Sequence, residues 1–126
     1  DRVVAQHQVT HRGLRDAILG SPHHRRYSAA FRTRVGPRLV ALIERAQREG
    51  SLRRGVTIGD FMVLLLMVGE LGPAGEAVSP GVHRRYLDLF LDSLMAREGR
   101  PALEPGITEV QAQEIMRRLA EARARR

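Results

Sequence analysis

The chain has 126 residues, of which 43% are hydrophobic and 28% charged, so it can form one globular domain and is not an intrinsically disordered chain. It contains no cysteine, which excludes disulfides and thiolate metal sites. All 21 basic residues are arginine and the net charge is +7, but a dense run occurs only at Arg117 to Arg126. A basic domain can bind nucleic acid, whereas scattered arginines favour a solvated surface with a basic tail.

The N-terminal part of the chain predicts helices separated by glycine and proline. Asp1 to Leu19 has broadly helical spacing of apolar residues, and Gly20-Ser21-Pro22 ends this pattern and starts another. Tyr27 to Glu49 is the longest helical pattern, with a kink or break expected at Gly36-Pro37. Gly50 provides a left-handed end to that helix.

The stretch from Thr57 to Leu71 is apolar nearly all the way round. Thr57 is the expected N-cap, and Asp60 offers a carboxylate to the first turn. Eight consecutive apolar residues, Phe61 to Val68, are too few for a helix that spans a bilayer, which needs about 20. Such a helix must be covered on more than one side. Either the rest of the chain wraps around it, or a second copy of the chain covers what remains.

Two more helices are predicted after this stretch. Ala74 to Val78 has the composition of a loop, and Ser79-Pro80 then starts a helix over Val82 to Ala96. A linker with two prolines, Gly99 to Gly106, leads to a last helix that begins at Thr108, with glutamine in the capping-box position. No segment alternates with the period of a strand, so the sequence predicts an all-α domain of five to six helices.

Few residues indicate chemistry. No nucleophile, phosphate loop or carboxylate pair stands where an enzyme would need it, so no catalytic residue and no cofactor is predicted. His7 and His11 are spaced so that both rings can bind one metal ion, but no third ligand is marked, and a polar helix face or a pocket rim is the alternative. Glu70 needs solvent or a partner, with Arg84 and Arg85 as candidates.

Three motifs follow one another: an E-G-x-L-R turn, a T-x-x-D apolar helix and a helix of R-x-Y-L-x-L-x-L-D-x-L character. Their residues are Glu49, Gly50, Leu52, Arg53, Thr57 and Asp60, then Arg85, Tyr86, Leu87, Leu89, Leu91, Asp92 and Leu94. This order, over roughly Arg12 to Arg97, resembles the C-terminal ligand-binding and dimerisation domain of TetR-family transcriptional regulators, especially the SbtR-like subgroup.

The resemblance implies a single ligand-binding and dimerisation domain over residues 1–126. The helices at Thr57–Leu71 and Val82–Ala96 would pair with their copies in a four-helix bundle, and their inner sides would enclose a pocket for a small, largely apolar effector. The interface residues implied are Met62, Leu66, Gly69, Tyr86, Phe90, Leu91 and Leu94. The candidate ligand-binding residues, chosen because they lie on the apolar faces of their helices, are Phe31, Val35, Leu39, Phe61, Leu64, Leu65 and Val68. The alternative is that these side chains interdigitate as a filled core.

The resemblance therefore implies a homodimeric sensor module of a cytoplasmic regulator, a repressor or an activator, with no enzymatic or membrane role. DNA would be bound only through the family's N-terminal helix-turn-helix domain, which is absent from this chain. Two alternatives stay open. A basic all-α protein that binds nucleic acid directly should gather its arginines in one stripe, and a metal-dependent helical protein should place a third ligand beside His7 and His11.

Overall fold

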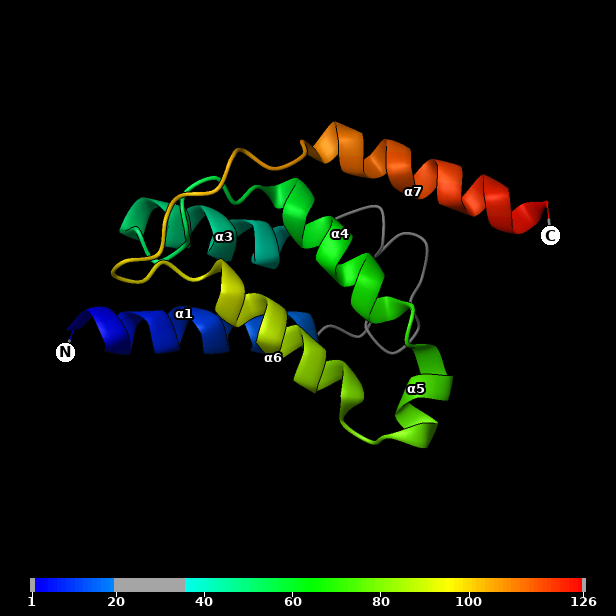
Figure 1. Cartoon of the computed structure of the whole chain (residues 1–126), viewed down its shortest axis with the longest axis horizontal. Helices are drawn as coiled ribbons and strands as arrows, with labels where there is room; N and C mark the ends of the chain where they lie inside the picture. The colour runs from blue at the N-terminus through cyan, green and yellow to red at the C-terminus, as the bar shows by residue number, and fades with distance from the viewer. Residues whose placement is uncertain (1, 20–35, 126) are drawn as a thin grey trace.

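The described part of the chain is built from helices (Figure 1). The computed structural model describes residues 2–19 and 36–125. The helices are α1 (Arg2–Leu19), α3 (Pro37–Glu49), α4 (Ile58–Gly69), α5 (Gly72–Val78), α6 (Val82–Leu94) and α7 (Glu109–Ala124). Among the described residues, the β-type pairing is limited to an isolated antiparallel bridge between Leu52 and Met95. The predicted all-α fold is confirmed.

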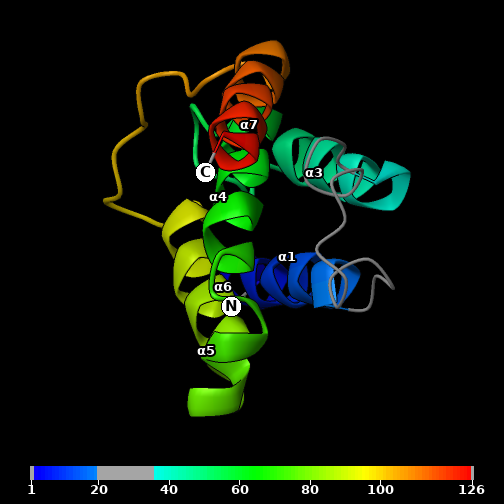
Figure 2. The same cartoon turned by 90° about the vertical axis from the view of Figure 1, so that its right-hand side faces the viewer.

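The helices lie in two layers. α6, α4 and α7 lie side by side in one layer, with α4 in the middle, and α1 and α3 form the other (Figures 1 and 2). α1 packs on α3 and on α6, while α4 packs on α6 and on α7. α5 follows α4 directly and turns the chain back into α6. α4 therefore connects the middle of the structure with both flanking helices of its own layer.

The ends of α4 and α7 follow from their capping residues. The Thr57 hydroxyl accepts the backbone N–H of Asp60 at 3.1 Å, and the Asp60 carboxylate accepts the backbone N–H of Thr57 at 2.9 Å. Thr108 and Gln111 form the same reciprocal pair at the start of α7. Each capping box satisfies two backbone donors that a helix start otherwise leaves unpaired. Both capping residues predicted from the sequence are thus confirmed.

Two segments differ from the sequence prediction in their boundaries. α3 begins at Pro37, so the expected irregularity at Gly36-Pro37 is a helix start, where proline costs no hydrogen bond. Residues 20–35, with the predicted break at Gly20-Ser21-Pro22, lie outside the described residues. The loop predicted over Ala74 to Val78 is wrong, because these residues complete α5, which has Pro73 in its first turn.

The main core joins the two layers. Leu14 of α1, Ile43 of α3, Phe61 of α4 and both Leu87 and Leu91 of α6 are at most 1% exposed and belong to one cluster. Burying such side chains is the main favourable contribution to folding, at about 1.5–3 kcal/mol for each large apolar residue. This cluster holds α1, α3, α4 and α6 together.

A second, smaller cluster lies between α4 and α7. It consists of Met62 and Leu66 on α4 with Ala112 and Met116 on α7. α4 is therefore buried on two sides by its own chain, which explains its apolarity. No single described helix is long and apolar enough to cross a membrane; α4 and α5 pass that test only as a pair, bent by 60°.

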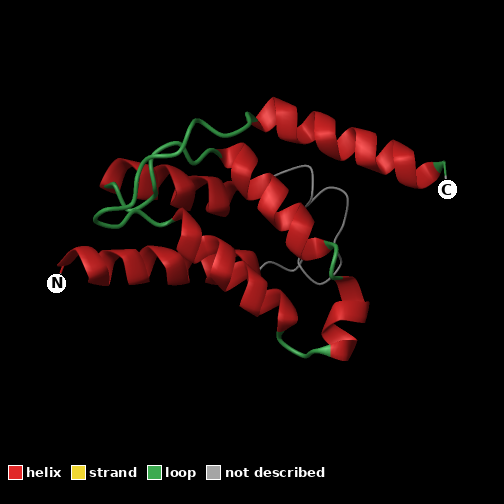
Figure 3. Cartoon of the chain, viewed as in Figure 1, coloured by secondary structure: helices red, strands yellow, loops and turns green. Residues whose placement is uncertain are grey.

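Residues 97–108, called the strap below, pass the start of α4 on the way to α7 (Figure 3). The backbone N–H of Leu103 donates to the carbonyl of Arg54 at 2.9 Å. The approach is so close that a Cβ atom on Gly59 would lie 2.2 Å from the carbonyl oxygen of Ile107. Only glycine at this position lets the strap pass α4 at this distance.

Alanine at Gly59 should destabilise the domain, because the new methyl group would meet backbone atoms and the strap would have to shift. We expect a loss of about 1–3 kcal/mol in the free energy of unfolding. The control is Gly13→Ala, since no atom lies within 4 Å of a Cβ there. In the middle of α1 this change should stabilise by about 0.5–1 kcal/mol. Urea unfolding of both variants measures the difference; equal effects would contradict the close approach of the strap.

Candidate functional site

The predicted ligand-binding residues that the structure describes lie together in the main core. Each is at most 9% exposed, and all belong to the same cluster of α1, α3, α4 and α6. These residues are Leu39, Phe61, Leu64, Leu65 and Val68. The other two, Phe31 and Val35, lie outside the described residues. The contact of this group with an effector stays a prediction.

Part of the predicted dimer surface is covered by the chain itself. Met62 and Leu66 pack under α7, at 1% and 8% exposure, and Gly69 is also buried. Leu91 is 0% exposed within the main core. These four residues offer little or no surface to a second copy in this arrangement, and a charge at Leu91 would disrupt the core instead of testing an interface.

The other predicted interface residues face outward on α6. Tyr86 is 41% exposed, and Phe90 and Leu94 are half-buried. Met67 on the neighbouring face of α4 is 54% exposed. The outer face of the α4–α6 pair thus carries apolar side chains that lack full cover in the single chain.

An open, mostly apolar groove of about 620 Å³ lies on this outer face, between α4, α6 and the strap. That volume lies within the range of small-molecule sites. The lining residues are Asp60, Val63, Leu64, Met67, Phe90, Ser93, Leu94, Leu103, Glu104, Gly106 and Ile107. The sequence did not predict Val63, Met67, Leu103 or Ile107 as pocket residues. The groove forms only because the fold brings the strap beside α4.

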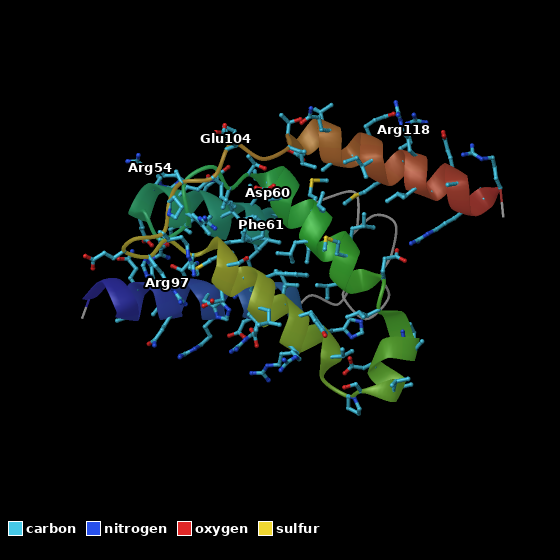
Figure 4. The ribbon with its side chains drawn as sticks, in the orientation of Figure 1. Arg54, Asp60, Phe61, Arg97, Glu104 and Arg118 are labelled. Atoms are coloured by element: carbon cyan, nitrogen blue, oxygen red, sulfur yellow. The ribbon has the colours of Figure 1, made fainter. Side chains whose placement is uncertain are left out.

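Two carboxylates, Asp60 and Glu104, lie where the strap passes the start of α4 (Figure 4). Asp60 is held by the N–H of Thr57, and it rests against Gly106, where a Cβ atom would come within 2.3 Å of both carboxylate oxygens. No arginine is among the described residues that line the groove. In a chain of net charge +7, this groove therefore combines an apolar wall with negative charge.

A second, more polar hollow of about 610 Å³ lies where α1 meets α6, beside His11 and Asp88. The Asp88 Oδ1 atom is shielded from solvent and lies 3.7 Å from His11 Nε2 and 3.6 Å from Arg15 Nη1. These polar side chains hold α1 against α6. Within the described residues, no three histidine or acidic side chains stand close enough to bind a metal ion.

Arginines in the described part of the chain are paired with acidic residues on several helices. Arg117 and Arg118 donate to Glu114 and lower the pKa of its carboxyl to about 2. Other pairs are Arg45–Glu49, Arg84–Asp88 and Arg97–Asp92. These arginines lie on several helices and are not gathered in one stripe, which does not favour direct nucleic-acid binding.

Of the two alternatives for Glu70, exposure to solvent is confirmed, because its side chain is 50% exposed at the end of α4. Its carboxylate forms an ion pair with Arg123 near the end of α7. The predicted partners Arg84 and Arg85 lie on α6, and Arg84 pairs instead with Asp88. The sequence prediction overlooked α7 as a neighbour of α4, and so overlooked this pair.

The bend from α5 into α6 is fixed by Glu76. Its carboxylate accepts the backbone N–H of Gly81 at 2.7 Å and lies 2.6 Å from His83 Nδ1. The N–H of Gly81, followed by the His83 side chain, lowers the pKa of the Glu76 carboxyl. These contacts set the direction of α6, which forms one wall of the groove.

Glu76→Gln should lower the melting temperature at neutral pH, because it removes the charged acceptor. A lowered pKa in the folded state means that the contribution is present above the pKa of the unfolded chain and is lost as pH falls through the lowered value. The difference from the wild type should therefore shrink as pH falls below about 4. Melting curves from pH 7 to pH 3 test this, with Glu98→Gln in the exposed part of the strap as control. A difference that does not change with pH would contradict the role of the charge.

The all-α fold is that expected of one class of protein, the C-terminal domain of a TetR-type transcription regulator, and the family comparison identifies this class. Residues 1–96 match the C-terminal domain of SbtR-like transcriptional regulators, which is 96 of the 126 residues. The chain belongs to this family. No curated protein and no solved structure gives a match. α7 and the whole strap lie beyond the matched residues.

Proposed function

We propose that this domain binds a small, largely apolar effector and holds two copies of a transcription regulator together. The family match over residues 1–96 carries this proposal, since TetR-type domains generally dimerise and bind small-molecule effectors. DNA would be bound by a separate helix-turn-helix domain. The dispersal of the arginines over several helices supports that division, because direct nucleic-acid binding needs them gathered in one stripe.

The outer face of α4 and α6 is the surface proposed for dimerisation. Met67 and Tyr86 are 54% and 41% exposed, although both are large apolar or aromatic side chains. Apolar patches of this kind on a folded domain mark interaction surfaces. A second copy on this face would remove them from water, and each buried CH₂ group would contribute about 0.8 kcal/mol.

The effector site is proposed at the inner side of α4, around Leu39, Leu64 and Leu65. The opposite side of α4 belongs to the outer face proposed for dimerisation. A ligand that favours one position of α4 would therefore also favour one arrangement of the two copies in the dimer. Such a ligand shifts the population of arrangements by its difference in affinity for them. This coupling would carry the signal to the DNA-binding domains.

Met67→Arg should convert a dimer to a monomer, because it places a charge on the outer face without disturbing the core. Val78→Arg is the matched control, since Val78 is 86% exposed on α5, away from this face. Sedimentation equilibrium at micromolar concentration measures the effect. A monomeric wild type under these conditions would sink the dimer proposal.

Apolar compounds that bind the proposed effector site should raise the melting temperature of the wild type. A compound at one hundred times its Kd stabilises by about 2.7 kcal/mol. Leu65→Ala should cost about 2–5 kcal/mol and should also weaken this stabilisation. Leu87→Ala, the same change in the core of α6, should cost a similar amount and leave the ligand effect intact. If no compound in a broad apolar panel stabilises the wild type, the effector proposal fails.

A further inference from the structure

α7, which lies beyond the family match, covers a side of α4 that the resemblance assigns to the dimer interface. α7 covers Met62 and Leu66 of α4, both of which the sequence prediction placed in the dimer interface. A four-helix bundle of two α4 and two α6 helices would need these side chains for the second copy. With α7 in place, the apolar side chains of α4 that remain half-buried or exposed toward the outer face are Val63 and Met67, respectively.

Several contacts hold α7 in this position. At its start, the Thr57 hydroxyl donates to the carbonyl of Ile107 at 2.6 Å, which joins the cap of α4 to the end of the strap. At the other end, Arg123 pairs with Glu70. Met116 is buried between these two points, at 5% exposure. α7 is therefore fixed along the length of α4.

The flank of α7 that carries Ile115 and Leu119 is apolar and remains open, with these residues 41% and 42% exposed. α4 and α7 run in the same general direction (Figures 1 and 2). Residues advance by about 100° each, in the same sense on both helices. On α7, Ile115 and Leu119 lie on the flank that comes just before the buried Met116 face in this rotation. On α4, Val63 and Met67 lie on the flank that comes just after the buried Leu66 face. Because the two helices face each other, both flanks point to the same side.

The outer face thus extends over three helices. α6 contributes Tyr86, α4 contributes Met67, and α7 contributes Ile115 and Leu119, all between 41% and 54% exposed. The groove lies within this face, between α4, α6 and the strap. This apolar surface is continuous with the α4–α6 face proposed above for dimerisation, and it includes two elements that the family match does not cover.

We infer that α7 is a third helix of the dimerisation face, so that a second copy of this chain docks across α6, α4 and α7 and closes the groove. This inference rests on the proposed dimerisation of the domain. Charge favours a second copy as the occupant: the groove presents Asp60 and Glu104 with no described arginine, while the chain as a whole carries 21 arginines. An arginine of the partner can then pair with these carboxylates at the edge of the apolar contact.

The test is the double variant Ile115→Arg/Leu119→Arg, compared with Val110→Arg. Val110 is 73% exposed and lies on the same helix, turned away from the flank of Ile115. We expect the double variant to raise the Kd of the dimer at least about tenfold, and Val110→Arg to leave it unchanged. Circular dichroism confirms folding, and Ile115→Ser/Leu119→Ser provides a milder variant with the same expected direction.

The outcomes separate this inference from the proposed function. If Met67→Arg dissociates the dimer while both double variants dimerise like the wild type, α7 lies outside the interface and the inference is overturned. A monomeric wild type overturns the dimer proposal and the inference together. If a long-chain alkylammonium compound stabilises a monomeric wild type, and Glu104→Gln abolishes that effect, the groove binds a small apolar cation and the inference is likewise overturned.

Discussion

The burial of α4 is the constraint on which the rest of the structure depends. A helix with eight consecutive apolar residues exposes too much hydrocarbon on any side left open. The main core takes the side with Phe61 and Leu65, and α7 takes the side with Met62 and Leu66. The order of the layers follows from this, because α6 and α7 must flank α4 while α1 and α3 cover it from behind.

Close backbone contact makes that arrangement specific. A hydrophobic face alone would allow α7 to slide along α4, since burial is not directional. The strap prevents this by its backbone hydrogen bonds, by passing Gly59 at a distance that no side chain would permit, and by placing its own Gly106 against the Asp60 carboxylate. The two capping boxes then define where each helix begins. Apolar area thus provides the stability of this part, and glycine and hydrogen bonds provide its register.

Much of the fold could be predicted from local sequence, because its signals act over a few residues. Thr57 with Asp60, Thr108 with its glutamine, and Gly50 each determine a helix end through their own neighbours. The partner of α4 was harder to predict, since Met62 and Leu66 look the same whether α7 or a second copy covers them. The same ambiguity left α7 out of the candidate partners of Glu70, whose carboxylate pairs with Arg123. Periodicity identifies an apolar face but not the element that covers it.

The position of α4 also has a consequence for signalling. Leu64 lies in the main core and also lines the outer groove, so one side chain contacts both compartments. Packed interiors deform little, and a shift of α4 on its inner side must be taken up by the groove, by α7, or by both. Since α7 is tied to α4 at both ends, it would move with α4 as one unit. In a dimer that uses α7, an effector in the core would therefore change the contact between the two copies on α4, α6 and α7 together. A small displacement of α4 would then alter a larger part of the interface.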